Sequence, residues 1–423
     1  MRALKYSGVE WIGDIPSDWN IIKIGNQYTE RKTKVSDKDY PPLSVTMKGV
    51  VPQLANAAKT DAHDDRKLVC VGDFAINSRS DRRGSCGISE YDGSVSLINT
   101  ILAPRDKMNP KYYNWLFHST MFSDEFYKWG HGIVNDLWTT NWQDMKHIAI
   151  PEPPLSEQER IADFLDRKCA EIDTVIEKTK ATIEEYKKLK QSVITEAVTK
   201  GIRGDRAMKD SGIDWIGDIP AEWEIRKLFR AIDKIGDIDH YMPNSVETGI
   251  PYLMTGDLKE KISQVDFDVC KQVSLEDYET LSSKIKATKG DIIFARYATI
   301  GTVCIVDIDK DFLVSYSCLT IKPTQSLLIG NFLFYYLKST AFFEDVKQYI
   351  NSNTQANVGL DSMTKAKIVL PTLQEQEEIA DFLDRKCAEI DKLIADKTHL
   401  LDEMESYKKS VIYEYVTGKK EVE

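Results

Sequence analysis

Two short polar segments in the first half of the chain carry side chains that could form hydrogen bonds with a nucleic acid. The first, NSRSDRRGS, follows a strand-like run and is rich in arginine. Its candidate contact residues are Asn77, Ser78, Arg79, Arg82 and Arg83. The planar fork of arginine suits phosphates and guanine edges, while serine and asparagine suit either. A solvated basic turn is the alternative interpretation of the same residues.

The second polar segment, GHGIVNDLWTTNWQ, offers amides and hydroxyls rather than an arginine cluster. Its candidate contact residues are Asn135, Thr139 and Asn141. Asparagine can pair with two atoms of an adenine edge, so these residues are candidate base readers. A polar surface loop that is satisfied by water is the alternative interpretation.

The second half of the chain offers different residues at the matching places. FARYATIGT stands where the first half has its arginine cluster, and NSNTQANVG stands where it has the amide-rich segment. The candidates there are Arg296, Tyr297, Thr299, Asn351, Asn353, Thr354 and Gln355. Because the matched residues differ in type, we expect the two halves to recognise different sequences.

The motifs that would perform catalysis on a nucleic acid are missing from the sequence. We find no S-adenosylmethionine loop, no N/D-P-P-Y/F element to grip a flipped base, and no G-x-x-x-x-G-K-[ST] phosphate loop. The zinc motif H-E-x-x-H does not occur, and the six histidines and seven cysteines lack metal-ligand spacing. We therefore expect no catalytic residues, metal or cofactor in this chain.

The cysteines and the hydropathy pattern indicate where the protein works. Scattered cysteines without a C-x-x-C pair are typical of reduced thiols in a cytosolic protein. No apolar run approaches the ~20 residues that span a bilayer. We expect a cytoplasmic protein that does not bind membranes.

An internal repeat organises these candidates. The segment SGVEWIGDIPSDW, from Ser7 to Trp19, returns as SGIDWIGDIPAEW, from Ser211 to Trp223, and we call the two copies the lead segments. Further along, IADFLDRKCAEID from Ile161 to Asp173 returns without change from Ile379 to Asp391. The chain is therefore two tandem copies of one plan.

Between the shared blocks the two copies differ in sequence but keep one pattern. Short β-rich stretches such as LVCVGDFAINS and GDIIFARYATIGTVCIVDI alternate with glycine and aspartate turns. Each block then ends in a helical pattern, YYNWLFHSTMFSDEFYKW in the first and NFLFYYLKSTAFFEDVKQYI in the second. The pattern predicts two α+β domains, each a twisted sheet with helices, within residues 1–150 and 205–370.

A long helix is predicted after each domain, within residues 151–204 and 371–423. No proline or glycine occurs from Glu157 to about Thr199, and Ser156 with Glu159 fits a capping box at the start. Apolar residues follow a 3–4 heptad pattern in both copies, which is typical of a coiled coil. We expect two long antiparallel helices that separate the domains and that follow the same pseudo-twofold repeat.

Two lysines interrupt the apolar rows of these helices at equivalent places. Lys190 stands in the first helix and Lys408 in the second. Leu189 and Tyr407, their neighbours, are expected to take over the seam at those positions.

Charged residues on the outer faces of the two helices are repeated as well. A coiled coil constrains only its seam, so outer residues are free to drift unless they contact something. The repeated candidates for a partner contact are Asp166, Arg167 and Lys168 in the first copy and Asp384, Arg385 and Lys386 in the second. A recent duplication is the alternative, although it would leave the intervening domains equally similar. The repetition favours two copies of one partner around a pseudo-twofold axis.

The formal net charge of −11 argues at first against a nucleic-acid partner. The acidity is uneven, however, because it lies mainly in the second lead segment and the C-terminal helix. The two α+β domains are close to neutral, so phosphate contacts would have to come from local basic clusters.

These motifs resemble the specificity subunit of type I restriction-modification enzymes. The resemblance is carried by PEPPLSEQERIADFLDRKCAEID before the first helix and by LPTLQEQEEIADFLDRKCAEID before the second. It covers essentially the whole chain. It implies a non-catalytic subunit with two target-recognition domains, each of which reads one half of a bipartite, asymmetric double-stranded DNA site.

The resemblance also implies partners. The helices would set the spacing of the half-sites, bind two methyltransferase subunits and support recruitment of ATP-dependent restriction and translocase subunits. S-adenosylmethionine, Mg²⁺ and ATP would then be held by the partner subunits.

Two other functions are compatible with the pattern. A coiled-coil adaptor could use its duplicated domains to bind protein partners rather than DNA. A DNA-modifying enzyme would require an activity without the motifs sought above.

Overall fold

The computed structural model of the chain describes residues 2–53, 63–105, 107–132, 138–297, 300–349 and 358–422. These residues form two compact units. The first unit combines Met1–Lys180 with His399–Glu423, and the second comprises Ala181–Thr398. Each unit therefore contains one sheet-bearing domain and one end of each long helix, α5 (Leu155–Lys200) and α10 (Leu373–Val416).

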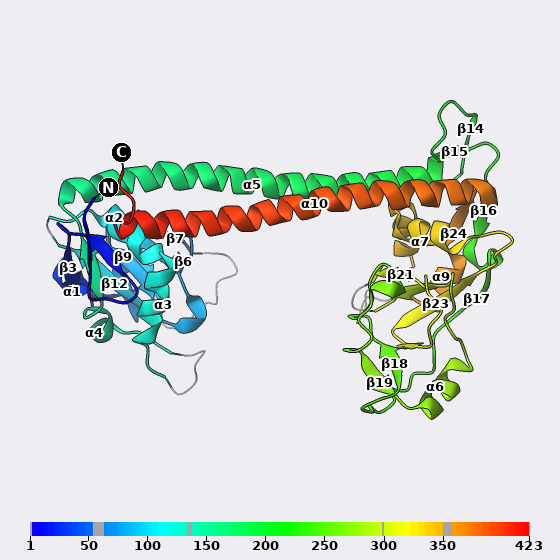
Figure 1. Cartoon of the computed structure of the whole chain (residues 1–423), viewed down its shortest axis with the longest axis horizontal. Helices are drawn as coiled ribbons and strands as arrows, with labels where there is room; N and C mark the ends of the chain where they lie inside the picture. Colours follow the sequence, from blue (N-terminus) through cyan, green and yellow to red (C-terminus); the bar gives the residue numbers. More distant parts are fainter. Residues whose placement is uncertain are drawn as a thin grey trace. The chain divides into compact units, whose positions relative to one another are not determined.

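The domain of the first unit is built on a four-stranded antiparallel sheet in the order β10-β9-β12-β4. Figure 1 labels β9 and β12 of this sheet. A three-stranded sheet β11-β8-β5 and the hairpin β6-β7 accompany it, and β1-β2 and β3-β13 form two further pairs. The strands are β1 (Leu4–Tyr6), β2 (Asp14–Pro16), β3 (Asn20–Lys23), β4 (Tyr28–Glu30), β5 (Lys34–Val35), β6 (Leu43–Thr46), β7 (Gly49–Pro52), β8 (Arg66–Val69), β9 (Phe74–Asn77), β10 (Cys86–Ile88), β11 (Gly93–Val95), β12 (Asn99–Pro104) and β13 (Ala149–Glu152). The helices of this domain are α1 (Ile24–Gln27), the 3-10 turn η1 (Ser80–Arg82), α2 (Pro110–His118), α3 (Thr120–Lys128) and α4 (Trp142–Met145).

The domain of the second unit repeats the four-stranded sheet in the order β17-β23-β20-β21. Its three-stranded sheet, β19-β18-β22, contains one parallel pair, β18 with β22. The strands are β14 (Met208–Asp210), β15 (Asp218–Pro220), β16 (Glu224–Lys227), β17 (Ile232–Gly236), β18 (Ile250–Leu253), β19 (Lys271–Val273), β20 (Ile292–Ala295), β21 (Val303–Ile305), β22 (Leu313–Val314), β23 (Cys318–Pro323) and β24 (Lys367–Leu370). The helices are α6 (Leu275–Ser282), α7 (Gly330–Lys338), α8 (Thr340–Lys347) and α9 (Leu360–Lys365), with the 3-10 turns η3 (Leu228–Arg230) and η4 (Ile262–Gln264).

The Gly-Asp pair that survives in both domains forms the same turn before the central strand. The carboxylate of Asp73 accepts a hydrogen bond from the backbone N–H of Cys70 at 2.9 Å, and that of Asp291 accepts one from Thr288 at 2.7 Å. The preceding Gly72 has a φ of +87°, a conformation that a side chain would strain. This turn directs β9 and β20 into the middle of their sheets.

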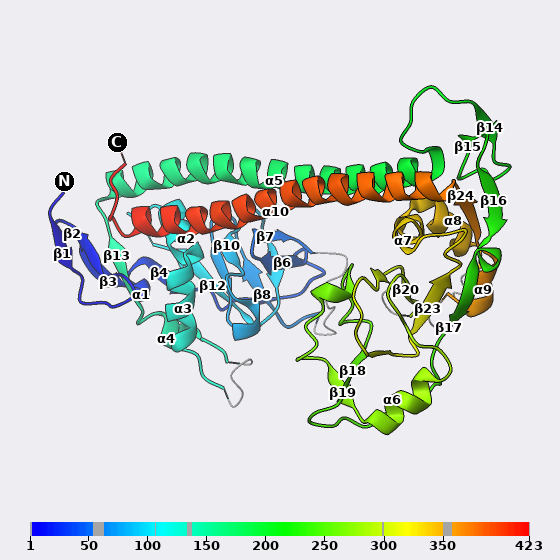
Figure 2. The same ribbon diagram turned by 45° about the vertical axis from the view of Figure 1, so that its right-hand side comes forward.

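The helical pattern at the end of each domain is confirmed as a pair of helices with a tight corner. Ser119 caps α3 by accepting a hydrogen bond from the N–H of Phe122, and Ser339 caps α8 through Phe342 in the same way. Serine is a favoured capping residue because its hydroxyl satisfies a free N–H at the helix start. In Figures 1 and 2, α2 lies beside the long helices of its unit.

The two long helices pack against each other, as the heptad pattern predicted, and their direction is antiparallel, as we expected. In the first unit Asp173 pairs with Lys408 at 2.6 Å, and in the second Lys190 pairs with Asp391 at 2.7 Å. Further along in the first unit, the ring of Phe164 lies against that of Tyr415, with centroids 4.3 Å apart and planes inclined by 34°. The start of α5 differs from the expectation, because the helix begins at Leu155 and Ser156 lies inside it rather than capping it.

The two lysines of the seam stay in it, contrary to the sequence interpretation. Lys190 and Lys408 are partly buried, and each donates to an aspartate of the opposite helix. Leu189 and Tyr407, which we expected to replace them, are exposed by 49% and 46%. The long lysine stem covers apolar seam surface while its ammonium reaches a carboxylate, so no substitute is needed.

The core of each domain continues into the helix ends. In the first unit Trp19, Tyr112 and Leu165 belong to one buried cluster that also includes Ile412 and Val416 of α10. The last turn of α10 and the tail after it contact the first lead segment, where Tyr413 Oη and Lys419 Nζ both donate to the carbonyl of Ile12. In the part of the chain that the structure describes, no helix is long and apolar enough to cross a membrane.

Candidate nucleic-acid interface

The two polar segments that the sequence singles out in the first domain lie against each other. The N–H of Thr140 donates to the carbonyl of Ser78 at 2.9 Å, and the N–H of Ser80 donates to the carbonyl of Trp138 at 2.9 Å. Arg79 and Thr139 also form an isolated antiparallel bridge. The loop after β9 and the loop before α4 therefore form one surface, which we call the first loop junction.

The second unit builds the same junction at the equivalent residues. The N–H of Val358 donates to the carbonyl of Arg296 at 3.2 Å. Val358 follows Thr140, and Arg296 follows Ser78, by the same number of residues that separates the repeated helix blocks. We call this the second loop junction. The sequence indicated four separate segments, whereas the fold joins them into two matching surfaces.

The candidates of the arginine cluster divide into buried and exposed residues. Asn77 and Ser78 are buried, because the Asn77 side chain accepts from the N–H of Arg79 and the Ser78 hydroxyl bonds to Thr100 Oγ1 at 2.9 Å. Arg82 and Arg83 face outward, with 67% and 58% of their side chains exposed. Arg79 lies between these two groups, since it is partly exposed. Arg82, Arg83 and part of Arg79, rather than the whole cluster, are available to a ligand.

Two neighbouring side chains orient Arg83, and its side chain remains exposed to solvent. Its Nη1 donates to Asp124 Oδ1 at 3.0 Å, and its guanidinium lies 5.1 Å from the ring centroid of Tyr127. Exposed ion pairs of this kind are weak, so a phosphate could displace Asp124 at little cost.

The second polar segment supplies one outward hydroxyl and one helix cap. Thr139 is exposed at the junction. Asn141 is exposed as well, but its carbonyl oxygen accepts from the N–H groups of Gln143 and Asp144 and so caps α4. The candidate Asn135 lies outside the described residues.

In the second junction Arg296 is buried rather than presented. Its side chain is 9% exposed, and its Nη2 forms an ion pair with Asp237. The guanidinium lies 4.9 Å from the ring centroid of Tyr297, which is partly exposed. The candidates Thr299, Asn351, Asn353, Thr354 and Gln355 lie outside the described residues.

The repeated aspartates of the helices contact their own domains. Asp166 accepts hydrogen bonds from Trp115 Nε1 at 2.8 Å and Lys111 Nζ at 2.9 Å. Asp384 accepts one from the hydroxyl of Tyr335 at 2.6 Å. Trp115 and Tyr335 hold matching places in α2 and α7, so these two aspartates make matching contacts within their own units, and their contact with a partner stays a prediction.

The other four repeated candidates face outward with only local contacts. Arg167 donates to the carbonyl of Asp163 at 3.3 Å, Lys168 pairs with Glu171 at 3.3 Å, and Lys386 pairs with Glu389 at 2.9 Å. Arg385 is exposed on the matching turn of α10. These residues remain accessible for a partner contact.

Sequence reasoning missed a buried carboxylate that attaches each lead segment to its helix. Glu157 accepts from Trp19 Nε1 at 3.0 Å, and Glu375 accepts from Trp223 Nε1 at 2.8 Å. Arg2 and Arg206 complete the two clusters, each pairing with the glutamate and lying over the tryptophan ring. The signal was present, since tryptophan and glutamate are both repeated, but it was split between distant blocks.

The fold brings one cysteine and one histidine together in a pairing that spacing did not reveal. Cys86 Sγ lies 3.8 Å from His118 Nε2 in the core of the first domain. Burial raises the pKa of the Cys86 thiol to about 12 and lowers the pKa of His118. A nucleophilic cysteine needs the opposite shift, so this pair is a packed contact rather than a catalytic dyad.

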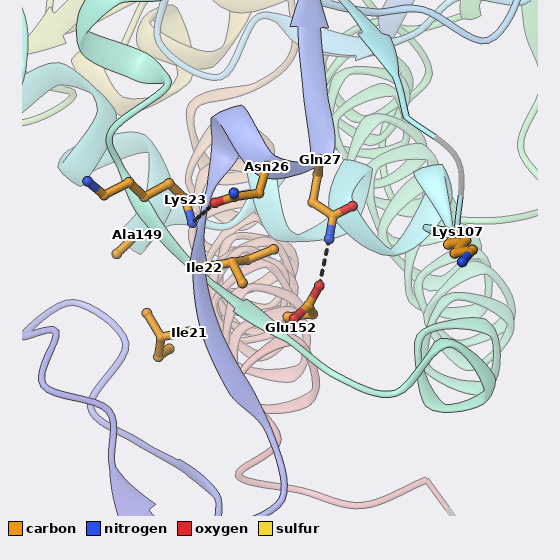
Figure 3. A pocket seen from close by; sticks show the side chains of 8 residues that line it. All are labelled: Ile21, Ile22, Lys23, Asn26, Gln27, Lys107, Ala149 and Glu152. Atoms are coloured by element: carbon orange, nitrogen blue, oxygen red, sulfur yellow. Dashed lines mark hydrogen bonds between the residues drawn. The ribbon is translucent and has the colours of Figure 1, made fainter.

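Polar groups also gather in an open hollow beside β3 and β13 (Figure 3). It has a volume of about 640 Å³ and is lined by Lys23, Lys107, Gln27 and Glu152 among others. The amide of Gln27 donates to Glu152 Oε1 at 2.8 Å, so the carboxylate of Glu152 already has a partner within the lining. Within the described ranges, no group of three or more potential metal-ligating side chains occurs.

The comparison with protein families decides what the repeated plan represents. The model of the type I restriction modification DNA specificity domain matches the chain twice, over residues 16–185 and 220–401. The chain belongs to this specificity family. Each match spans a domain and part of the helix that follows it, so the internal repeat is a repeat of the specificity domain.

Known specificity subunits extend over the same length. The type I restriction enzyme MjaVIII specificity subunit of Methanocaldococcus jannaschii is 25% identical over 422 residues, which cover 96% of this chain and 93% of the relative. The putative MjaX specificity subunit of the same organism is 24% identical, with coverages of 96% and 95%. The chain is thus a type I specificity subunit with two target-recognition domains, and the adaptor alternative has no support.

Solved specificity structures share the fold. A chain from a study of complex assembly and conformational transition in a type I R-M system superposes with a TM-score of 0.72 at 15% identity, covering 96% of this chain and 99% of the other. The HsdS subunit of Thermoanaerobacter tengcongensis gives 0.51 at 16% identity, with coverages of 96% and 98%. The α+β fold with two long helices predicted for this specificity chain is confirmed.

Proposed function

We propose that this specificity subunit reads a bipartite, asymmetric DNA target, with one half-site at each loop junction. The observation that carries the proposal is that the same backbone hydrogen bond builds both junctions while the side chains around it differ. The shared backbone hydrogen bond places each junction at the equivalent position of its domain. The different side chains around it would then select different bases. The subunit itself recognises and does not catalyse.

The exposed residues of the first junction supply the contacts expected there. Arg82 and Arg83 are placed to meet phosphates or a guanine edge, and Thr139 adds a hydroxyl beside them. Asn141 can still donate through its amide, because only its carbonyl oxygen is used as the cap. Asn77 and Ser78 act in this scheme by holding the loop.

We infer that two methyltransferase subunits dock on the helix pair, one on each unit. Val175 and Tyr407 are exposed in the first unit, and Leu189 and Leu393 are exposed in the second. Val175 corresponds to Leu393 in the repeat, and Leu189 corresponds to Tyr407. Each of the four stands immediately before a seam residue. We call each pair a helix patch.

The two residues of a helix patch lie on the same side of the seam. In an antiparallel pair, the positions just before the seam residues of the two helices face each other across the groove. The two residues of each patch also lie at the same level along the helix axes. Ion pairs between the helices show this, because Asp173 pairs with Lys408 beside the first patch and Lys190 pairs with Asp391 beside the second. Because the patches are related by the repeat, they suit two copies of one partner.

The charged candidates extend this docking surface along the helices. Lys168 and Lys386 occupy the same side of the heptad as the patches, two turns away, and Arg167 and Arg385 lie beside them. Long basic side chains at the rim would pair with acidic groups of the methyltransferase and set its orientation.

The remaining components belong to the assembled complex. We propose that S-adenosylmethionine is held by the methyltransferase subunits, that ATP and Mg²⁺ act in restriction and translocase subunits, and that the complex works in the cytoplasm. The helix pair would set the number of base pairs between the half-sites. The proposed parts of the chain are residues 1–150 and 205–370 for recognition and 151–204 and 371–423 for the helices.

The test exchanges one recognition domain. Residues 20–150 are replaced by those of another specificity subunit, the chain is assembled with its methyltransferase partners, and methylated adenines are mapped in exposed DNA. We expect one half-site to change and the other to stay. A change in both half-sites, or in neither, contradicts the modular proposal.

A further inference from the structure

A cluster of charged and aromatic side chains lies beside the second loop junction, in a segment that the sequence did not single out. After β17 the chain turns through Asp237 to His240, and this turn packs against Arg296. Tyr316, from the segment between β22 and β23, completes the cluster. The cluster joins three parts of the second domain at one place.

The buried part of the cluster is rigidly held. Asp237 pairs with Arg296 and also with Lys284 at 3.3 Å. The guanidinium of Arg296 donates in addition to the carbonyl of Tyr316 at 3.4 Å, and its backbone is fixed by Ser317 and Val358. Arg296 Nε is buried and has no hydrogen-bond partner among the described residues. Arg296 therefore serves as an internal brace rather than as an outward fork.

His240 is the member of the cluster that points outward. Its side chain is 60% exposed, yet its ring is stacked on Tyr316 with centroids 4.9 Å apart and planes inclined by 26°. Its Nε2 lies 3.1 Å from Asp237 Oδ2. An exposed side chain that is held on both the ring face and one nitrogen loses little entropy when it binds a ligand.

The hydrogen bond to Asp237 determines what the other nitrogen can do. A carboxylate only accepts, so this contact requires the hydrogen of the neutral imidazole on Nε2. Arg296 Nη2 also lies 3.3 Å from Nε2, but its two hydrogens are directed to Asp237 and to the carbonyl of Tyr316. Nδ1 is therefore left as the acceptor. Among the described residues, Nδ1 has no hydrogen-bond partner. In the major groove, the donors that would satisfy it are the amino groups of adenine N6 and cytosine N4.

We propose that His240 is a specificity-determining residue for the second half-site and that its Nδ1 accepts a hydrogen bond from the amino group of an adenine or a cytosine. Arg296 is its positioning residue, acting through Asp237. The inference rests on the proposed function, because it assumes that the second unit reads DNA. It adds a contact from the turn after β17 to those expected from the junction itself.

The test compares two phenylalanine variants in the complex assembled with methyltransferase subunits. His240→Phe keeps a ring that can stack on Tyr316 but removes both nitrogens. His399→Phe makes the same change at an exposed residue of α10, far along the chain from the junction residues. Each complex methylates a DNA library in which the second half-site is randomised, and the methylated fraction is read by sequence.

We expect His240→Phe to reduce the preference for adenine or cytosine at one position of the second half-site by about tenfold, the lower range for a base contact. The first half-site and the other positions keep their preferences, and His399→Phe matches the unmodified complex. Equal weakening on all sequences would mean a phosphate contact and would overturn the inference. An unchanged preference would overturn it as well.

Two controls separate this inference from the proposed function. If the unmodified complex methylates without sequence preference, the proposed function itself is contradicted, and the role of His240 is contradicted with it. If it is selective and His240→Phe is equally selective, only the inference fails. Thermal unfolding of the two phenylalanine variants checks that neither has lost its fold. A third variant, Arg296→Lys, should lower the preference at the same position of the half-site as His240→Phe does.

Discussion

A buried carboxylate at the start of each long helix is the residue that attaches the lead segment to the rest of its unit. Glu157 and Glu375 are both buried, and each is surrounded by a tryptophan N–H and an arginine. The carboxylate of Glu157 in turn raises the pKa of Arg2. A buried charge is tolerated only when such partners satisfy it, so the three groups depend on one another.

Removing this carboxylate should destabilise the unit that contains it. We expect Glu157→Ala to lower the free energy of unfolding by about 2–4 kcal/mol, because the indole N–H of Trp19 and the guanidinium of Arg2 lose their acceptor. Chemical denaturation followed by tryptophan fluorescence measures the change. Glu159→Ala, on the exposed side of the same turn, should change it by less than about 0.5 kcal/mol. Equal losses in the two variants would contradict the role given to Glu157.

Residue type alone indicated which segments form the loop junctions. It did not indicate which side chains face outward and which are buried there. Arg82 and Arg83 face outward as expected, whereas Arg296, of the same type, is buried against Asp237. The sequence does not reveal this, because Asp237 belongs to another segment of the domain. His240 escaped notice for the same reason, since only the fold brings it to Arg296.

At the scale of elements, the helix pair combines a conventional seam with two lysines. Apolar heptads predicted the pairing, and the direction follows from the ion pairs that each unit repeats. What the heptads could not predict is that Lys190 and Lys408 remain in the seam. A polar residue at one seam position costs stability but fixes the register of a coiled coil, because any shift leaves the charge without its partner.

The helix patches provide the test of partner docking at this scale. Tyr407→Glu places a charge in the patch of the first unit, and Leu189→Glu does so in the second. We expect each variant to weaken the binding of one methyltransferase subunit by about tenfold or more, since a buried charge would lack a partner. Native mass spectrometry of the assembled complex counts the bound subunits.

The matched control for the patches is His399→Glu. His399 is exposed on α10 but does not stand beside the seam. It should leave both methyltransferase subunits bound. Loss of both subunits from a single patch variant would argue against one docking surface on each unit.

At the scale of the whole molecule, the compact units of the structure do not follow the order of the domains in the sequence. The repeat predicts domains in sequence order, whereas the first compact unit is completed by His399–Glu423 from the other end of the chain. Local patterns predicted the two long helices, the helical end of each domain and the β-rich stretches that contain β9, β20 and β21, but not short helices such as α6. They could not predict that the last turns of α10 pack into the core of the first domain, because this contact is between residues far apart in sequence.

Lengthening both long helices should change the spacing of the DNA target. Seven residues inserted after Lys180 in α5 and seven after Thr398 in α10 keep the heptads in phase and add about 10 Å to each helix. That length corresponds to about three base pairs, so we expect a spacer longer by about three. Mapping of methylated adenines with the assembled complex measures it.

Insertion into α5 alone is the control for this prediction. It shifts the seam of one helix against the other and separates ion pairs such as Lys190 with Asp391, so the complex should lose activity. A spacer that stays unchanged after the paired insertion would contradict the role of the helices in setting the distance.

The contacts between residues 411–419 and the first domain have a consequence for synthesis on the ribosome. Tyr413 and Lys419 bind the carbonyl of Ile12, and Val411, Ile412 and Val416 fill the core of the first domain. These residues emerge after Ala181–Thr398, which is a continuous stretch. The second unit can therefore finish folding before the first, although most of the first domain is synthesised earlier. Until then, the newborn first domain exposes apolar surface that a chaperone would recognise.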